Sequence, residues 1–328
     1  MSWSDCKYNE TEWDIILTRL GINSFKSTFN YSLMLINNNW QVRHITFSKN
    51  NKIISASQIF IKKKYSFMNF IYVPGGVEGI INDEIIEELK NYIFKNFSMI
   101  KIVFLNLHNQ NTDAIKFSSW NKINYFRNFH LTALKVLPNL SDDIINHYSR
   151  NWRHNLKRSK KYDLNIINNN KPDYEELKNL IINFENLKKI SITQNFQDIF
   201  DVFQFFKNNV IHLECRKNNK LIAVRSVIFF NNTAWDFLAI SSSEARVTYA
   251  TYFLMDNILK QLHVRKVRIY NLSGIDKHHN LGVYNFKKGL NPNEFQTMGD
   301  YFLSNLNFLS FIFSLLINFK RAINIFLK

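Results

Sequence analysis

The segment that decides the fold reads NLSGID at residues 271–276 and GVYNFKKGL at residues 282–290. Its first half is typical of a strand that ends in a glycine turn at Gly274, which places the flanking side chains at the open end of a sheet. Its second half predicts a short helix that displays Tyr284 and Lys287, three residues apart, on one face. A lysine in that position can meet negative charge that develops during a reaction.

Two interpretations of this lysine are open. In the first, Lys287 belongs to an active site. In the second, Lys287 and Lys288 form a solvated pair that follows a core Phe286. Composition alone favours the second interpretation, so the sequence around the segment has to decide.

The residues before this segment predict an antiparallel sheet with a helix behind it. Runs at 211–216, 221–230 and 234–240 are apolar and β-branched, and Asn-Asn pairs separate them as in tight hairpins. A helix over 247–262 and a strand over 266–272 follow. Ahead of these runs, the pattern predicts helices near 141–148 and over 150–161, a strand over 163–167 and a helix over 172–189.

The first half of the chain follows the same order of elements. Between residues 31 and 73, the runs YSLMLI, WQVRHITF, KIISASQIFI and FMNFIYV predict an antiparallel meander. It ends at Pro-Gly-Gly, residues 74–76, and a helix over 83–97 and a buried strand over 100–107 follow. Each half therefore predicts a mixed, mostly antiparallel sheet flanked by helices, which is an α/β (α+β) fold.

Length and composition agree with two globular domains. The chain has 328 residues, 46% of them hydrophobic and 15% aromatic, with only 4 Pro and 8 Gly. These values exclude disordered and fibrous proteins, and the absence of an internal repeat excludes solenoids and propellers. With a boundary near residues 137–141, we expect an N-terminal domain over 1–138 and a C-terminal domain over 139–300.

The charge of the chain points to anionic partners. Lys and Arg total 42 against 26 Asp and Glu, a net charge of +16, which suits phosphate-bearing ligands or an anionic membrane face. The chain is also rich in Lys, Asn and Ile, so clustering is the better evidence. Residues 150–161 hold six cations and no acid. Their spacing predicts a helix that holds phosphates through several donors, or else a solvated helix face.

Cysteine and histidine usage excludes several kinds of site. Cys6 and Cys215 are too few for a disulfide framework or a four-ligand zinc site, and no metal-binding His spacing occurs. The N-terminal residues lack the apolar region of a secretory signal, so we expect a cytoplasmic protein. No Ser-His-Asp or Cys-His pattern stands out, and we expect no metal and no cofactor.

The C-terminal residues predict an amphipathic helix. Residues 301–319 carry no charge and precede Lys320 and Arg321, while polar residues recur at helical spacing on one narrow stripe. This favours a tail over 301–328 that lies on a membrane surface rather than spanning it. The alternative is an apolar helix that packs on its own domain.

The segment over 271–290 resembles the C-terminal signature of the FemABX family and its GNAT-like relatives. In that family a strand ends in a glycine turn and a Phe-Lys-x-Gly-Phe motif follows. Here Leu290 replaces the last phenylalanine.

Two further segments resemble the same family. Residues 72–77 are similar to its Tyr-x-Pro-Arg-Gly-Pro segment, with Gly75 in place of the arginine and Val77 in place of the second proline. Residues 150–161 are similar to its Arg-x-x-Ile-Arg-x-Ala-x-Lys helix. The matches follow the family's order and span roughly residues 40–300.

This resemblance implies two tandem GNAT-like domains and an enzyme that transfers acyl groups. The family moves an aminoacyl group, usually from aminoacyl-tRNA, onto an amine of a lipid-linked or nucleotide-linked envelope precursor. We expect catalytic roles for Lys287, Phe286 and Asp276, and substrate or phosphate contacts from Arg150, Arg153, Lys157, Arg158, Tyr284, Gly274, Gly75 and Gly76. Glu78 and Asp276, each beside a glycine turn, are candidate bases.

Three functions follow from these observations. The first is aminoacyl transfer onto a peptidoglycan or surface-polysaccharide precursor at the inner face of the cytoplasmic membrane. The second is acyl-CoA-dependent N-acylation of an amino sugar in a surface glycan. It is disfavoured because residues 244–251 lack the glycines of a pyrophosphate loop and place Tyr249 there. The third is an inactive scaffold that binds tRNA or the membrane.

Overall fold

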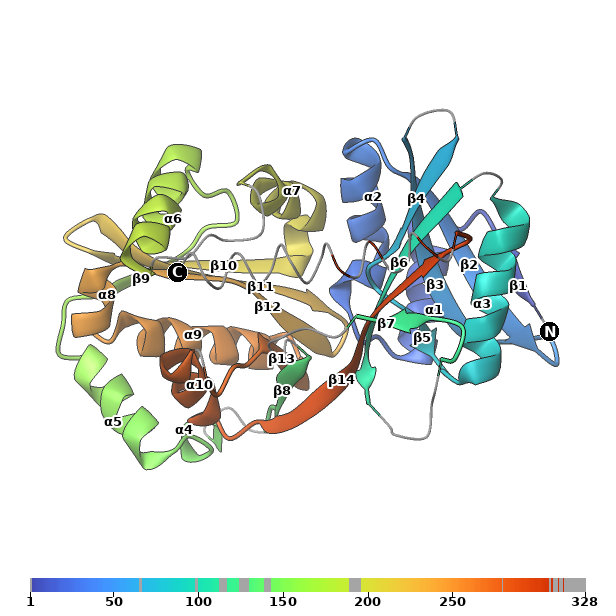
Figure 1. The fold of residues 1–328 in the computed structure, drawn as a ribbon. Coiled ribbons are helices and arrows are strands. Elements are labelled where there is room, and N and C mark those ends of the chain that lie inside the picture. Colours follow the sequence, from blue (N-terminus) through green and yellow to red (C-terminus); the bar gives the residue numbers. More distant parts are fainter. Residues whose placement is uncertain are drawn as a thin grey trace. The chain divides into compact units, whose positions relative to one another are not determined.

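The protein is described by a computed structural model over residues 2–64, 67–97, 100–111, 117–123, 130–138, 143–188, 196–278 and 280–306, and at residues 308, 312 and 315. The chain forms two compact units: Met1–His130 with Phe295–Lys328, and Leu131–Glu294. Each unit has its own sheet and its own hydrophobic core (Figure 1). The expected mixed α/β class, with mostly antiparallel sheets, is confirmed.

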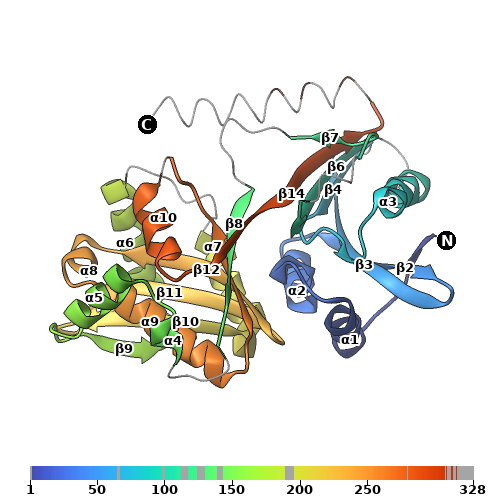
Figure 2. The same ribbon diagram turned by 90° about the horizontal axis from the view of Figure 1, so that it is seen from below.

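The first unit is a sheet in the order β1-β2-β3-β4-β6-β14. Its pairs are antiparallel except for the parallel pair β4 and β6. The helices α1 and α2 cover one face of the sheet and α3 covers the other (Figure 2). The elements are β1 (Trp3–Asp5), α1 (Glu10–Leu20), η1 (Phe25–Ser27), α2 (Phe29–Asn37), β2 (Gln41–Lys49), β3 (Lys52–Lys64), β4 (Met68–Val73), β5 (Glu78–Gly79), α3 (Asp83–Asn96), β6 (Ile100–Gln110), β7 (Asn121–Lys122) and β14 (Asn293–Ser304).

The second unit is a sheet in the order β8-β13-β12-β11-β10-β9, antiparallel except for β12 and β13. The helices α6 and α7 lie on one face, and α5, α9 and α10 lie on the other (Figure 1). The elements are β8 (Leu131–Val136), α4 (Asp143–Asn146), α5 (Arg150–Ser159), β9 (Asn165–Asn168), α6 (Tyr174–Lys188), α7 (Phe196–Phe206), η2 (Lys207–Asn209), β10 (Val210–Lys217), β11 (Lys220–Phe230), β12 (Thr233–Ser241), α8 (Ser243–Val247), α9 (Ala250–Val264), β13 (Ile269–Gly274) and α10 (Leu281–Lys288).

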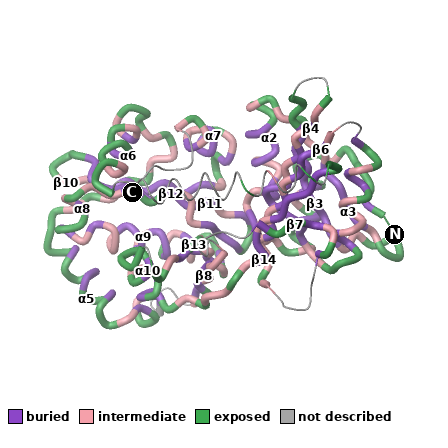
Figure 3. The backbone as a smooth tube through the Cα atoms, viewed as in Figure 1, coloured by how far each residue is buried: buried purple, intermediate pink, exposed green. Residues whose placement is uncertain are grey.

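Asparagine turns close the hairpins of both sheets, as the sequence predicts. Asn218 and Asn219, between β10 and β11, have φ values of 49° and 63°. Asn50 and Asn51 do the same between β2 and β3. Asparagine tolerates this left-handed conformation better than other side chains with a Cβ, and two such residues match the twist of antiparallel strands. The strands that these turns connect are buried along their central residues (Figure 3).

The structure corrects the prediction at residues 31–36. This apolar run is not a strand but the centre of α2. The side chain of Thr28 caps the helix by accepting a hydrogen bond from the backbone N–H of Tyr31. A capped apolar run buries one helical face against the sheet, so the local β propensity of its residues does not decide.

The two units also differ from the expected ranges 1–138 and 139–300. After the second unit, the chain returns to the first unit as β14, which pairs antiparallel with β6 from Thr297 to Ser304. The expected helix over 301–319 is therefore wrong for residues 301–304, and the rest of that prediction falls mostly outside the described residues. Among the helices that are described, none has the length and apolar character to span a membrane.

Candidate active site

The helix α10 carries Lys287 into the interior of the second unit. The residue is only 7% exposed, whereas its neighbour Lys288 is exposed. Lys287 Nζ donates a hydrogen bond of 2.9 Å to the carbonyl oxygen of Gly274. The structure therefore brings the two halves of the 271–290 segment together, and a solvated pair does not describe Lys287.

The Gly274 carbonyl lies where β13 separates from β12. These parallel strands pair only over Thr233–Trp235 and Ile269–Asn271. Beyond that point Ser273 adopts a φ of 61°, and its Oγ donates a hydrogen bond of 2.8 Å to the carbonyl oxygen of Asp236. This side-chain bridge stands in place of a backbone ladder bond, so the two strands diverge at the end of β13, where the Gly274 carbonyl accepts the hydrogen bond from Lys287.

A buried ion pair lies next to this opening. Arg225 Nη2 donates to Asp236 Oδ2 at 2.6 Å, and both side chains are less than 10% exposed. Tyr270 donates from its hydroxyl to Asp236 Oδ1 at 2.9 Å. Burial opposes the charge of Arg225, but the Asp236 carboxylate holds the pKa of Arg225 above its ordinary value. Arg225, Asp236 and Tyr270 form a fixed polar cluster next to α10.

Burial and these neighbouring charges together set the protonation of the lysine. Burial is the largest cause and lowers the pKa of Lys287, the Asp236 carboxylate opposes it, and the positive charge of Arg225 adds to it, so that the pKa is about 8. At neutral pH most Lys287 side chains are therefore ammonium groups, with roughly a tenth neutral. An ammonium held in a dry site can stabilise an oxyanion, and a lysine with this pKa can also release a proton.

Phe286 anchors the helix beside this lysine. Its ring lies 5.0 Å from the ring of Tyr252 and 5.9 Å from that of Trp152, measured between centroids. The Arg225 guanidinium lies 5.7 Å from the Phe286 centroid on a neighbouring element. Phe286 is thus held between the sheet and two helices, and its own contacts are hydrophobic and cation–π in character.

The other residues predicted near Lys287 take separate positions. Tyr284 is buried on α10, with the ammonium groups of Lys277 and Lys288 5.5 and 5.7 Å from its ring centroid. Asp276 follows β13, and its Oδ1 accepts the backbone N–H of His278 at 2.9 Å. This bond makes Asp276 a turn-forming residue of the loop before α10, and its role as a base stays a prediction.

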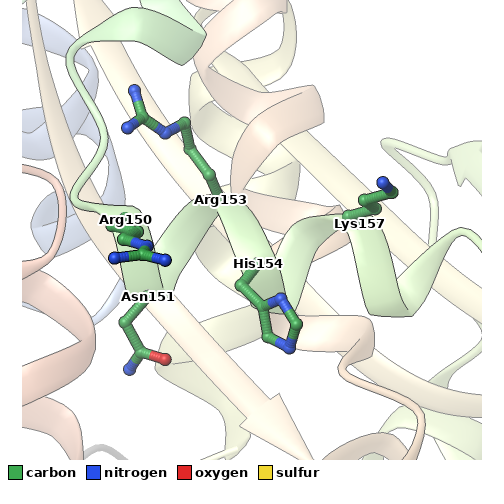
Figure 4. A pocket seen from close by; sticks show the side chains of 5 residues that line it. All are labelled: Arg150, Asn151, Arg153, His154 and Lys157. Carbon is green, nitrogen blue, oxygen red and sulfur yellow. The ribbon is translucent and has the colours of Figure 1, made fainter.

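The basic helix predicted from the sequence is α5. Its buried side packs through Trp152 and Leu156, whereas all of its cations are exposed. The described part of the chain shows no ion pair to any of them. A depression of about 540 Å³ lies along the helix (Figure 4), lined by Arg150, Asn151, Arg153, His154 and Lys157.

The arrangement on α5 suits a ligand with more than one phosphate. In Figure 4, Arg153 and Lys157 extend from one side of the helix, and Asn151 and His154 extend from the other. Separate donors along one helix can contact successive phosphates of a chain. Arg158 has a different partner, because its guanidinium lies 4.6 Å from the centroid of the Tyr249 ring.

Tyr249 belongs to the segment 244–251, which lacks the glycines of the pyrophosphate loop of CoA enzymes. It precedes α9 with a φ of 57°, a left-handed conformation that is unusual for an aromatic residue. Its ring and the Arg158 side chain lie together at the start of the helix. That phosphates would approach this backbone with difficulty stays a prediction.

Gly75 and Gly76 lie in the first unit and are buried. A Cβ on Gly75 would overlap with Ser27, and one on Gly76 would overlap with the Asn106 carbonyl oxygen, where φ is also +74°. These contacts explain why the turn after β4 needs two glycines. Their predicted contact with substrate stays a prediction.

Glu78 follows this turn and is fully buried. Its carboxylate accepts hydrogen bonds from the Asn23 backbone and side chain, from the Ser24 backbone and from the Ser27 hydroxyl. Burial raises its pKa to about 7, although these donors oppose the shift. Every bond holds the loop before α2 in place, so the geometry gives Glu78 a structural role rather than that of a base.

Sequence reasoning missed Arg225, Asp236 and Tyr270. In the pairing of β11 with β12, Arg225 lies opposite Ala239. The register shifts after Ser226, so that Val227 lies opposite Asp236. The extra residue in β12 moves Asp236 onto the face of Arg225. A charged residue in each of two apolar strands was a visible signal, but the bulge that joins them was not.

Comparison with known proteins supports the expected family resemblance. The FemAB family model matches residues 167–314, a range that contains β10 to β13 and α10. No curated protein matches the chain. The match includes the whole Lys287 site but less than half of the chain.

Solved structures establish the fold. The structure of FemX superposes with a TM-score of 0.73 at 11% identity, over 91% of this chain and 96% of that one. The C-terminal domain (DUF2156) of a putative lysylphosphatidylglycerol synthetase from Agrobacterium fabrum gives 0.54 at 11% identity, over 96% and 98%. A tandem GNAT protein from the clavulanic acid biosynthesis pathway gives 0.52 at 8% identity, over 92% and 98%.

These matches confirm the expected tandem GNAT-like fold. Together with the family match, they confirm the resemblance to FemAB proteins and the expectation that the chain is an acyltransferase. Of the three functions considered, the two enzymatic ones are therefore favoured over the scaffold.

Proposed function

We propose that this FemAB-like acyltransferase moves an aminoacyl group from aminoacyl-tRNA onto an amine of a peptidoglycan or surface-polysaccharide precursor. The observation that carries the proposal is the buried Lys287 ammonium at the point where β12 and β13 separate. It provides a fixed positive charge for an acyl-transfer step and requires no nucleophile from the protein.

The chemistry is an aminolysis. The neutral amine of the acceptor attacks the ester carbonyl of the aminoacyl-tRNA, and its lone pair forms the new C–N bond while the carbonyl oxygen becomes an oxyanion. Lys287 donates a hydrogen bond to that oxyanion. The C–O bond to the terminal ribose then breaks, and the proton lost by the amine ends on the ribose hydroxyl. Phe286 lies beside the reacting groups and fixes the helix that carries Lys287.

The donor is proposed to bind along α5. A tRNA end presents consecutive phosphates, and the helix exposes Arg150, Arg153 and Lys157 without acidic neighbours in its sequence. Contacts of this kind recognise backbone rather than base sequence.

The donor site gives a test of its own. We expect Arg153→Gln/Lys157→Gln to weaken binding of aminoacyl-tRNA by about tenfold or more and to reduce the salt dependence of binding by roughly two phosphate contacts. Filter binding or fluorescence anisotropy over a salt series measures both quantities. Lys178→Gln/Lys188→Gln on α6, on the opposite face of the sheet, removes the same charge and serves as the control. Equal losses in the two variants would show that only net charge matters.

The acceptor is proposed to be an envelope precursor on the inner face of the cytoplasmic membrane. One structural neighbour is named as a putative lysylphosphatidylglycerol synthetase, and the product in that name is an amino acid attached to a membrane lipid. This supports a membrane-associated acceptor. The net charge of +16 favours approach to an anionic lipid surface. Peripheral association through the C-terminal residues belongs to this proposal.

The acceptor can be identified by mass. We expect muropeptides, surface saccharides or their lipid-linked intermediates from cells that lack the gene to lose the mass of an amino-acid residue, and a plasmid copy to restore it. A copy carrying Lys287→Ala should not restore it. Mass spectrometry of these fractions decides, and loss of an acetyl or other simple acyl mass would instead identify a thioester donor.

That second function, acyl-CoA-dependent N-acylation of an amino sugar in a surface glycan, is supported by the tandem GNAT fold. Tyr249 and Arg158 at the start of α9 argue against it. A rise in Tm with CoA would favour this function, because a ligand that binds the folded state stabilises it.

A further inference from the structure

Gly289, the second glycine of the GVYNFKKGL segment at residues 282–290, lies against the basic helix α5. A Cβ on Gly289 would be 2.7 Å from Cδ1 and 3.3 Å from Cβ of Trp152, and 3.2 Å from Ser149 Oγ. Its φ of −65° and ψ of −11° are ordinary helical values that any residue adopts. Packing, and not backbone conformation, therefore requires a glycine at this position.

Two hydrogen bonds hold the same contact together. The backbone N–H of Ser149 donates to the Gly289 carbonyl oxygen at 2.8 Å. Asn291 Nδ2 donates to the His147 carbonyl oxygen at 2.9 Å. The C-terminal end of α10 is thus fastened to the N-terminal end of α5.

The position of Lys287 depends on this joint. Lys287 is two residues before Gly289, and its neighbour Phe286 packs on Trp152, the residue that Gly289 contacts. At the other end of the same side chain, Nζ reaches the Gly274 carbonyl. A shift of α10 away from Trp152 would therefore move Lys287 relative to the end of β13.

We propose that Gly289 is a positioning residue: because it has no side chain, α10 seats against Trp152 of the basic helix, and this seating holds Lys287 Nζ at the Gly274 carbonyl. The proposal rests on the catalytic role proposed for Lys287. In this proposal α5 has two roles. Its exposed side offers cations to the donor, and its buried side, through Trp152, holds the helix that carries Lys287.

The charged and titratable groups around Lys287 make the seating measurable. Arg225 and Asp236 act on it from β11 and β12, Tyr270 of β13 is bonded to Asp236, and Tyr284 and Lys288 belong to α10 itself. If α10 moves outward, Lys287 gains solvent, which relieves the burial that is the largest cause of its lowered pKa. It also moves away from Asp236 and Arg225, whose charges act on its pKa in opposite directions. Because the relief of burial dominates, the midpoint of its titration rises.

The experiment compares Gly289→Ala with Gly282→Ala on the same helix. A Cβ on Gly282 meets nothing within 4 Å, so this variant adds the same methyl group in open space. Trace acetylation by acetic anhydride between pH 6 and pH 11, read by peptide mass spectrometry, gives the titration of Lys287. We expect a midpoint near pH 8 in the wild type and in Gly282→Ala, and a midpoint shifted toward 10.5 in Gly289→Ala.

Turnover should follow the titration. Misplacement of a catalytic group by about an ångström costs up to about 100-fold in rate, so we expect kcat of Gly289→Ala to fall about 10- to 100-fold, with KM for the donor little changed. A folded Gly289→Ala protein with wild-type midpoint and kcat would overturn the proposal. Should that variant fail to fold, Asn291→Ala loosens the joint without adding atoms, and an unchanged midpoint there would overturn it equally.

The outcomes separate this inference from the proposed function. If Lys287→Ala keeps wild-type turnover, the proposed role of Lys287 fails. If Lys287→Ala is inactive while Gly289→Ala behaves like Gly282→Ala, only the positioning role of Gly289 fails.

Discussion

Replacement of Lys287 by alanine is expected to lower the rate of acyl transfer by roughly 10²–10³-fold, the usual effect of removing one oxyanion donor. The ammonium lies in a buried site, where its charge is worth more than in water, and the neighbouring cation Arg225 is committed to Asp236 and does not take its place. Single-turnover transfer from aminoacyl-tRNA to the identified acceptor measures the rate. Lys288→Ala, the adjacent exposed lysine on the same helix, should stay within about twofold of the wild type.

A stability measurement separates a catalytic lysine from a structural one. The folded-state pKa of Lys287, about 8, lies below its ordinary 10.5, so the buried charge destabilises the fold fully below pH 8 and the penalty is relieved between pH 8 and pH 10.5. Lys287→Met keeps the apolar stem and should raise the free energy of unfolding at pH 7 by as much as roughly 3 kcal/mol. A variant that loses both stability and activity would contradict a functional role.

The sequence predicted the second unit better than the first because its signals are local there. Three features there can be recognised from neighbouring residues alone: the paired asparagines form turns, the basic run at 150–161 forms a helix face, and residues 271–290 form a strand, a turn and a helix. In the first unit, residues 31–36 are apolar except for Ser32, and the Thr28 cap and the packing against the sheet make them helical. Residues 293–304 become a strand because β6, far away in the sequence, provides the hydrogen bonds. No local pattern contains that partner.

The same distinction applies to the site. The strand, the glycine turn at Gly274 and the helix that carries Lys287 are local in sequence, so the sequence predicts these elements; the hydrogen bond between Lys287 and Gly274 is a finding of the structure. The pairing of Arg225 with Asp236 depends on the bulge in β12, since a regular ladder would place these side chains on opposite faces. The bulge is a property of strand pairing, and the sequence of either strand alone does not reveal it.

Removal of the Asp236 carboxylate is expected to cost the fold about 3–5 kcal/mol, because Arg225 then remains as an unpaired charge in a buried site. Urea unfolding of Asp236→Leu at pH 7 measures the loss. The matched control is Glu294→Ala, which breaks the 3.0 Å ion pair with Lys277 in the same unit. That lysine is 45% exposed, so water replaces its partner and the loss should stay below about 1 kcal/mol.

The double variant Arg225→Met/Asp236→Leu tests the cause of this loss. If the cost comes from the orphaned charge, removing both partners should restore most of the stability, since a buried ion pair seldom exceeds a well-packed apolar pair in net contribution. Equal instability of the single and double variants would show that shape at this position, and not charge, supports the fold. The double variant also leaves Lys287 without both charges that face it, while its burial stays. Its pKa should then remain well below 10.5, which makes burial the main cause of the shift.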